Sequence, residues 1–122
     1  MSHTLKVKAK FTDPKAVEAA AKEMGAEIVR GKLKLHQPDS AVENGFGVKL
    51  PGWRLPVIIN TQTGEASYDN YKGRWGAESE LHKFTQLYAT HKATLFAKSK
   101  GLLVTRTTQA NGSIKLQLSG AL

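Results

Sequence analysis

Apolar and basic positions alternate along two stretches of this chain. Near the start, the apolar set is Leu5, Val7, Ala9 and Phe11, and the basic set between them is Lys6, Lys8 and Lys10. Further on, the apolar set is Val29, Gly31, Leu33 and Leu35, and the basic set is Arg30, Lys32, Lys34 and His36. A period of two predicts strands that bury one set and present the other. If both strands lie in one sheet, we expect the basic side chains to share its outer face.

Two helices are predicted from caps and spacing. Asp13 followed by Pro14, with Gly25 as the stop, predicts a helix over 14–24. A second helix, from Glu78 to Lys100, has acidic residues in its first turn and basic residues in its last, which suits the helix dipole. Its expected buried stripe recurs at spacings of three and four and consists of Leu81, Phe84, Tyr88, His91 and Leu95.

The remaining strands are predicted from β-branched runs and turn residues. We expect strands over 4–11, 27–36, 102–108 and 113–118, and a hairpin over 55–68 that turns near Gly64. Asn111-Gly112 predicts a tight turn between the last two strands. The prolines and glycines of 37–54 indicate a loop or a short strand-loop excursion.

This order predicts an α+β fold over residues 1–122 as a single domain. We expect an antiparallel or mixed sheet with two helices packed on one face, and a split βαβ, ferredoxin-like arrangement is left open. A chain of 122 residues is long enough to bury one core.

The charge of the chain is more informative about its partners than the rest of its composition. The formal net charge is +8, and no Asp or Glu occurs from Leu81 onward. Such a balance favours anionic partners, which we expect to be nucleic acid or an acidic protein rather than a membrane. No stretch reaches the ~20 apolar residues of a membrane helix, and the N-terminus lacks a signal-peptide pattern. We therefore expect a cytoplasmic protein of a bacterial or phage-infected cell, with the plastid stroma as the alternative.

Candidate catalytic and metal-binding patterns are absent from the sequence. There are no cysteines, and the four histidines (His3, His36, His82 and His91) lack the spacing of a zinc helix. Neither a nucleophile elbow nor a P-loop occurs. We expect a protein that is not an enzyme and holds no metal or cofactor.

The middle third contains a basic-aromatic stretch. Trp53, Tyr68, Tyr71 and Trp75 are interleaved with Arg54, Lys72 and Arg74, most densely over 71–75. On a loop that enters a helix, such residues suit contact with a single strand, because rings stack on bases and cations meet phosphates. The alternative is that the tryptophans cap the edge of the core. The lysines also have an alternative use, which is to prevent edge-to-edge aggregation of strands.

The two ends of the chain resemble a known family. The residues that carry the resemblance are Met1-Ser2-His3 with the alternating strand after it, Gln86-Leu87-Tyr88-Ala89, His91-Lys92, and Asn111-Gly112-Ser113-Ile114-Lys115-Leu116-Gln117-Leu118. Together they resemble the uncharacterised family of the chloroplast hypothetical reading frame thirty-five product, which has plastid, bacterial and phage relatives. The family has no assigned activity, so the resemblance implies no catalytic residue. The relatives' occurrence beside AAA-type ATPases implies an accessory role.

We therefore expect a small, non-enzymatic, basic binding module that contacts nucleic acid or another polyanion. The expected phosphate contacts are Lys6, Lys8, Lys10, Arg30, Lys32 and Lys34, with Arg106 and Lys115 as additions. The expected secondary contact is Tyr71, Arg74 and Trp75. The alternative is a protein-interaction or adaptor role, either with an ATPase partner or as a self-assembling homo-oligomer.

Overall fold

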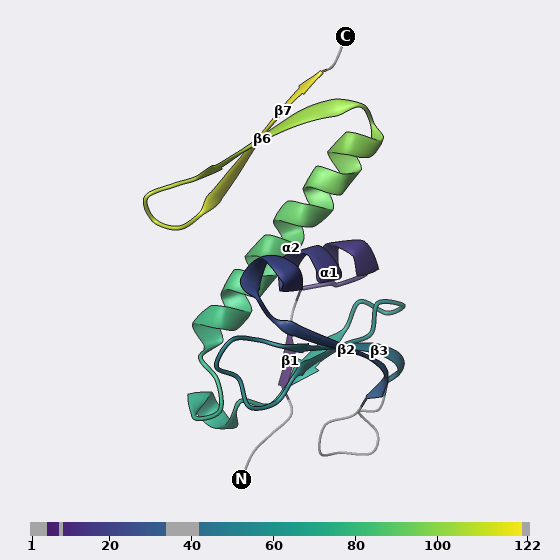
Figure 1. Cartoon of the computed structure of the whole chain (residues 1–122), viewed down its shortest axis with the longest axis vertical. Coiled ribbons are helices and arrows are strands. Elements are labelled where there is room, and N and C mark those ends of the chain that lie inside the picture. The colour runs from purple at the N-terminus through teal and green to yellow at the C-terminus, as the bar shows by residue number, and fades with distance from the viewer. Residues whose placement is uncertain (1–4, 8, 34–41, 121–122) are drawn as a thin grey trace.

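The computed structural model describes residues 5–7, 9–33 and 42–120, which form two α-helices and two antiparallel sheets (Figure 1). In chain order the elements are β1 (Leu5–Val7), α1 (Pro14–Met24), β2 (Glu27–Leu33), β3 (Val42–Lys49), β4 (Val57–Ile59), β5 (Ala66–Tyr68), the short 3₁₀ turn η2 (Tyr71–Gly73), α2 (Glu78–Ser99), β6 (Leu102–Thr108) and β7 (Ile114–Gly120). The larger sheet has the order β1-β5-β4-β3-β2, and β6 pairs with β7 alone. The predicted α+β class is confirmed. Every described strand pair is antiparallel, so β1 and β2, which α1 connects, run in the same direction with three strands between them, and they form a split βαβ unit. The ferredoxin-like arrangement does not occur, because β6 pairs with β7 in a separate sheet.

The helix α1 has the predicted bounds because its caps are local. The Asp13 carboxylate accepts the backbone N–H groups of Lys15 and Ala16, at 3.0 and 3.3 Å. Gly25 ends the helix with a φ of 74°, a conformation that glycine adopts without steric cost. The buried face of α1 consists of small residues, which lets the helix approach its neighbours closely; these are Ala16, Val17, Ala20 and Ala21.

The core lies between the larger sheet and the two helices. Phe11 is fully buried and its ring lies 5.6 Å from that of Phe84 and 4.8 Å from that of Tyr88, both on α2. The Tyr88 hydroxyl also accepts the backbone N–H of Asp13 at 3.0 Å, so α2 is attached to the start of α1. Burial of each such aromatic ring contributes about 1.5–3 kcal/mol to stability.

Of the two alternatives predicted for 37–54, the loop is wrong and the strand-loop excursion is nearer to the structure, because β3 is an eight-residue strand next to the edge strand β2. It pairs with β2 on one side and with β4 on the other. Gly47 lies opposite Val29, and a Cβ atom there would come within 3.1 Å of the Leu33 side chain. A side chain at position 47 would therefore need Leu33 to shift by a few tenths of an ångström, so glycine suits this close approach although it reads locally as a loop residue. Residues 37–41 lie outside the described part of the chain.

Helix α2 extends beyond the larger sheet and carries the β6–β7 hairpin with it (Figure 1). The predicted stripe is buried at Leu81, Phe84 and Tyr88, but Leu95 is 37% exposed. The described strands of the larger sheet do not extend alongside the last turns of the helix, so the stripe is not covered there (Figure 1). We call residues 95–120 the C-terminal arm, and the rest of the described chain the body. Neither helix in the described residues is long and apolar enough to cross a membrane.

Candidate nucleic-acid interface

The two lysine-rich strands lie in one sheet but are not neighbours. β1 and β2 form opposite edges of the larger sheet, with β5, β4 and β3 between them. The first strand is also shorter than predicted, so Lys10 lies beyond its end and is exposed beside Gly64. Lys6 pairs in register with Ser67. Lys8 and Lys34 lie outside the described residues, as does the side chain of Lys6. Three strands therefore separate the two basic rows, and a shared phosphate-binding face stays a prediction for Lys6, Lys8 and Lys34.

The orientation predicted for the second strand is reversed at Arg30. In the β2–β3 register, Arg30 lies opposite Phe46, a residue of the core, and its guanidinium stands 4.4 Å from the Phe46 ring centroid. The same guanidinium pairs with Glu18 of α1. Arg30 therefore faces the helices, whereas Val29 faces the other side and is 56% exposed. The cation–π contact and the ion pair together let a cation occupy the rim of the core face.

Lys32 is exposed, as predicted, and its ammonium lies 3.7 Å from the Glu43 carboxylate of β3. Gly31, with a φ of 130°, precedes it at a register shift between the two strands. Such a shift interrupts the strict alternation on which the predicted lysine row depended.

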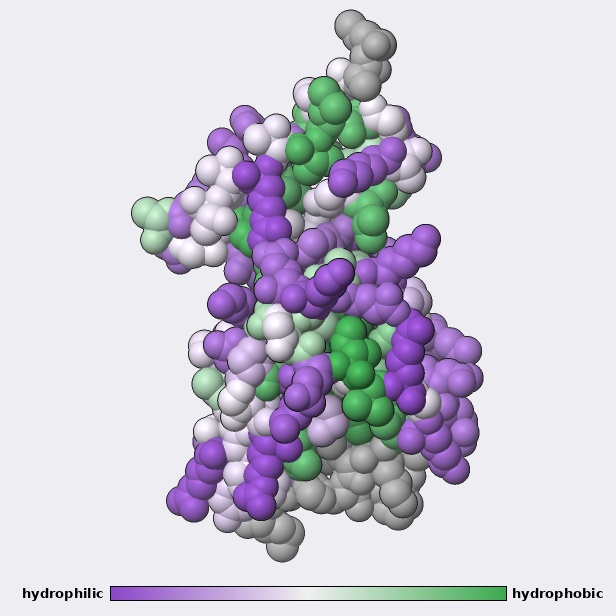
Figure 2. Space-filling model, in the orientation of Figure 1, coloured by the Kyte–Doolittle hydropathy of each residue, from purple (hydrophilic) through white to green (hydrophobic). Residues whose placement is uncertain are grey.

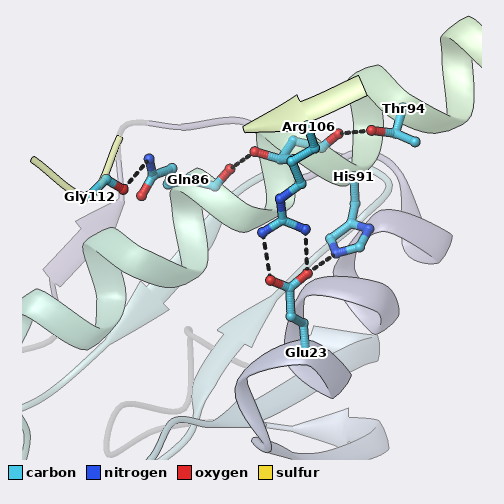
Figure 3. A network of polar contacts seen from close by, with 7 residues as sticks. Glu23, Gln86, His91, Thr94, Arg106 and Gly112 are labelled. Carbon is cyan, nitrogen blue, oxygen red and sulfur yellow. Dashed lines mark hydrogen bonds and ion pairs between the residues drawn. The ribbon is translucent and has the colours of Figure 1, made fainter. Parts of the chain in front are cut away.

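Arg106 occupies a structural position between three elements (Figure 3). Its two terminal nitrogens donate to the two carboxylate oxygens of Glu23 on α1, at 2.9 and 2.6 Å. His91 Nε2 of α2 lies 2.8 Å from the same carboxylate. An ionised carboxylate only accepts, so this ring nitrogen carries the proton. Lys115, the other predicted addition to the phosphate contacts, pairs with Thr107 and so lies on the face of the hairpin opposite to Arg106.

This ion-pair cluster changes the acidity of Glu23. The hydrogen bonds from Arg106 and then His91 lower the pKa of Glu23 from 4.5 to about 2, against the opposing effect of burial. The same pairing raises the pKa of Arg106. The predicted role of Arg106 as a phosphate contact conflicts with this geometry, because its guanidinium fork already holds a carboxylate.

The three residues of the predicted secondary contact, Tyr71, Arg74 and Trp75, lie close together in the structure. Tyr71 and Trp75 stack with ring centroids 4.9 Å apart and planes inclined by 26°. The Arg74 guanidinium lies 5.4 Å from the Tyr71 ring, and that of Arg54 lies 5.0 Å from the Trp75 ring. We call these four residues, with the exposed Lys72 between them, the basic-aromatic platform.

Backbone hydrogen bonds hold the platform together from two segments. The Arg54 N–H donates to the Trp75 carbonyl at 2.7 Å, and the Trp75 N–H donates to the Asn70 carbonyl at 2.9 Å. The buried carboxylate of Asp69 accepts the Tyr71 N–H at 3.0 Å. Although Arg54 is remote in sequence from Trp75, this pairing fixes its place over the ring.

Buried side chains support the platform from below. The Trp53 ring is 2% exposed, and its Nε1 donates to the Ala77 carbonyl at 3.0 Å. The Asn70 amide donates to the Gly76 carbonyl at 3.2 Å. A Cβ atom at Gly76 would come within 2.5 Å of the Trp53 ring, so only glycine fits between the platform and this indole. Trp53 thus caps the core, as the alternative interpretation held, while Trp75 belongs to the platform.

Two platform residues have a strained backbone. Tyr71 and Lys72 adopt φ values of 49° and 55°, a region that residues with a side chain rarely occupy. Each such conformation costs about 1–3 kcal/mol and persists only where the surroundings impose it. Here it turns the chain tightly enough for the ring of Tyr71 to meet that of Trp75.

The platform has an excess of positive charge. Arg54, Lys72 and Arg74 are exposed, while the Asp69 carboxylate, which accepts the Tyr71 N–H, is buried. The sequence pointed to this cluster through the density of basic and aromatic residues in 71–75, but the membership of Arg54 depends on the fold.

Elsewhere in the described residues, no three His, Asp or Glu side chains come together in a way that could hold a metal. Comparison of the chain with family models, with curated proteins and with solved structures found no match. The family resemblance of the two chain ends therefore stays a prediction.

Proposed function

We propose that this protein binds single-stranded nucleic acid through the basic-aromatic platform and does so without catalysing a reaction. The observation that carries the proposal is the stacked pair of Tyr71 and Trp75 with a guanidinium over each ring. Single-strand binders combine rings on which bases stack with cations that follow the phosphates. Arginine serves both purposes, because its planar group stacks on bases and its fork matches phosphate oxygens.

The platform suits a single strand better than a duplex. Rings contact bases only where the bases are unpaired and can leave their own stack. Lys10 and Lys32 are exposed cations at opposite edges of the larger sheet, so they would add long-range attraction without forming one site.

The test is fluorescence anisotropy with labelled single-stranded and duplex oligonucleotides over a series of salt concentrations. We expect micromolar binding of the single strand, weaker binding of the duplex, and a steep decrease with salt. Trp75→Leu should weaken single-strand binding about fivefold to thirtyfold, because loss of one stacked base costs about 1–2 kcal/mol. Arg74→Gln should reduce the slope of log affinity against log salt by about 0.7 for one lost phosphate contact.

The matched controls are exposed cations outside the platform. Lys83→Gln on α2 and Lys115→Gln on β7 remove the same charge as Arg74→Gln, so they should change affinity much less. Circular dichroism melts verify that each variant folds. Equal binding of single strand and duplex, together with equal effects of the platform and control variants, would refute the proposal.

A further inference from the structure

Apart from the platform, the molecule has an apolar groove between β1 and α2. One hollow of about 610 Å³ lies between Val7 and Ala9 on one side and Leu81 and Thr85 on the other. A second hollow, of about 470 Å³, continues along α2 to Phe96. Both hollows are lined by Ala9 and Thr85, so they form one continuous groove.

The groove follows one stripe of α2. Its lining residues on the helix recur at spacings that keep them on one side, and they include Leu81, Thr85, Ala89, Lys92 and Phe96. At 1.5 Å per residue, the stripe from Leu81 to Phe96 is about 22 Å long. That length accommodates several residues of an extended peptide or about four turns of a helix.

The floor of the groove is apolar and open to solvent. Ala89 and Ala93 present methyl groups, and Phe96 is 63% exposed at one end. Large exposed apolar side chains beside a hollow mark surfaces that bind other molecules. Alanine methyls with one ring at the end match apolar side chains of a peptide better than they match a chain of phosphates.

The charged side chains described along the rim of the groove are basic. Lys10 and Lys92 lie along the groove and His82 lies at its other end, and none of the described lining residues is Asp or Glu. The sequence has no Asp or Glu after Glu80. An occupant with negative charge therefore meets complementary charge along the groove.

We infer that this groove docks a segment of another protein that combines acidic residues with apolar anchor residues. Its apolar side chains would cover the alanines and Phe96, and its carboxylates would reach Lys10 and Lys92. A second copy of this chain is disfavoured as the occupant. A symmetric dimer through the groove would place Lys10 and Lys92 of one copy near those of the other, and each chain carries a net charge of +8. The site is separate from the platform and the inference does not depend on nucleic-acid binding.

The test is selection from a displayed library of random peptides, carried out in parallel on the wild-type protein and on Ala89→Arg. The new arginine fills the floor of the groove at an exposed helical position, where it is well tolerated. We expect peptides that pair Asp or Glu with Leu or Phe to be enriched on the wild type and lost on Ala89→Arg. Ala110→Arg, in the exposed turn of the hairpin, is the control and should retain them.

Charge reversal then tests the rim with one selected peptide. Lys10→Glu with Lys92→Glu should weaken its affinity at least about tenfold, whereas Lys83→Glu with Lys98→Glu, outside the groove, should change it less than about threefold. Melting curves establish that both variants fold. The inference is overturned by equal enrichment on wild type and Ala89→Arg, by selected peptides without acidic residues, or by equal effects of the two reversals. It is also overturned if a single-stranded oligonucleotide displaces the peptide from the groove, or if the wild type is a dimer that Ala89→Arg dissociates.

Discussion

The body and the C-terminal arm cover their apolar residues very differently. In the body, Phe11, Ile59 and Phe84 are fully buried between the larger sheet and the helices. In the arm, Phe96, Leu103 and Leu118 are 63%, 62% and 53% exposed. Both regions have sequences of ordinary helix and strand type, so the difference arises from the second layer, which the body has and the arm largely lacks.

Polar contacts attach the arm to the body in addition to limited packing. Glu23 of α1 holds Arg106 of β6, and the Gln86 amide donates to the Gly112 carbonyl in the hairpin turn at 3.3 Å (Figure 3). Ile114 packs at the edge of the core. Figure 2 shows apolar surface along the upper part of the molecule, where the arm lies. The arm should therefore be the less stable region, and paired substitutions can measure the difference.

The largest contrast is expected between two phenylalanines of α2. Phe84→Ala should lower the free energy of unfolding by about 3–5 kcal/mol, because it leaves a cavity beside Phe11. Phe96→Ala removes a ring that is mostly exposed and should change stability by less than about 0.5 kcal/mol. Urea unfolding followed by circular dichroism measures both, and similar losses would mean that the arm is covered in solution.

A second contrast uses the same substitution at two glycines. Gly76→Ala forces a Cβ atom against the rigid Trp53 ring and should cost about 1–3 kcal/mol. Gly120→Ala meets no atom within 4 Å at the end of β7, so the change should be within about 0.5 kcal/mol. Thermal melts of the two variants compare them. An unchanged melting temperature for Gly76→Ala would show that the Trp53 ring beneath the platform can move aside to admit the new methyl group.

A smaller effect is expected at the attachment of the arm. Glu23→Gln removes the charge that holds Arg106 and His91, and it should weaken the arm by about 1 kcal/mol, since the carboxylate is partly exposed to solvent. That corresponds to about fivefold faster amide hydrogen exchange in β6 and β7. Glu18→Gln, on the same helix, serves as the control because it removes only the exposed pair with Arg30. Equal exchange in the two variants would contradict the attachment.

The same attachment should depend on pH. The pKa of Glu23 in the folded protein, about 2, is below its ordinary value of 4.5, so the ionised form is favoured by folding. The stabilisation is complete above pH 4.5 and is lost as the pH falls towards 2, by about 1 kcal/mol after allowance for solvent screening. Hydrogen exchange of the arm, corrected for its intrinsic pH dependence, should lose protection over this window in the wild type. Glu23→Gln has no carboxylate to protonate at this position, so the hydrogen-exchange protection of the arm should not show this loss between pH 4.5 and 2.

The smallest effect is expected on the surface of the hairpin. Leu103→Thr with Leu118→Thr keeps strand-forming residues at two exposed positions. Stability should change by less than about 0.5 kcal/mol for each, while solubility should increase because exposed apolar area is removed. Chemical unfolding and the saturation concentration provide the two readouts. A loss well above 1 kcal/mol would mean that another surface covers these leucines.

Much of the fold was predictable where the signal is local. The bounds of α1 followed from Asp13, Pro14 and Gly25, and the hairpin of the arm followed from Asn111-Gly112, because caps and turns satisfy their backbone groups within a few residues. β3 was predicted only as one of two alternatives, because Gly45 and Gly47 read locally as loop residues, whereas a Cβ atom at either position would come within 3.1 Å of another side chain. The orientation predicted for Arg30 was wrong, because alternation alone does not say whether the apolar or the basic set of a strand faces the core.

The sequence by itself determined where the helices and most strands lie, that the chain is strongly basic, and that Tyr71, Arg74 and Trp75 belong to one dense stretch. Only the tertiary structure decided that the lysine strands lie at opposite sheet edges, that Arg54 joins the aromatic pair, and that Glu23 holds Arg106. The physical reason is the distance along the chain over which each interaction acts. Caps, turns and periodicity act between residues close in the chain, whereas strand order and ion pairs between elements depend on how the whole chain satisfies its core and its backbone hydrogen bonds.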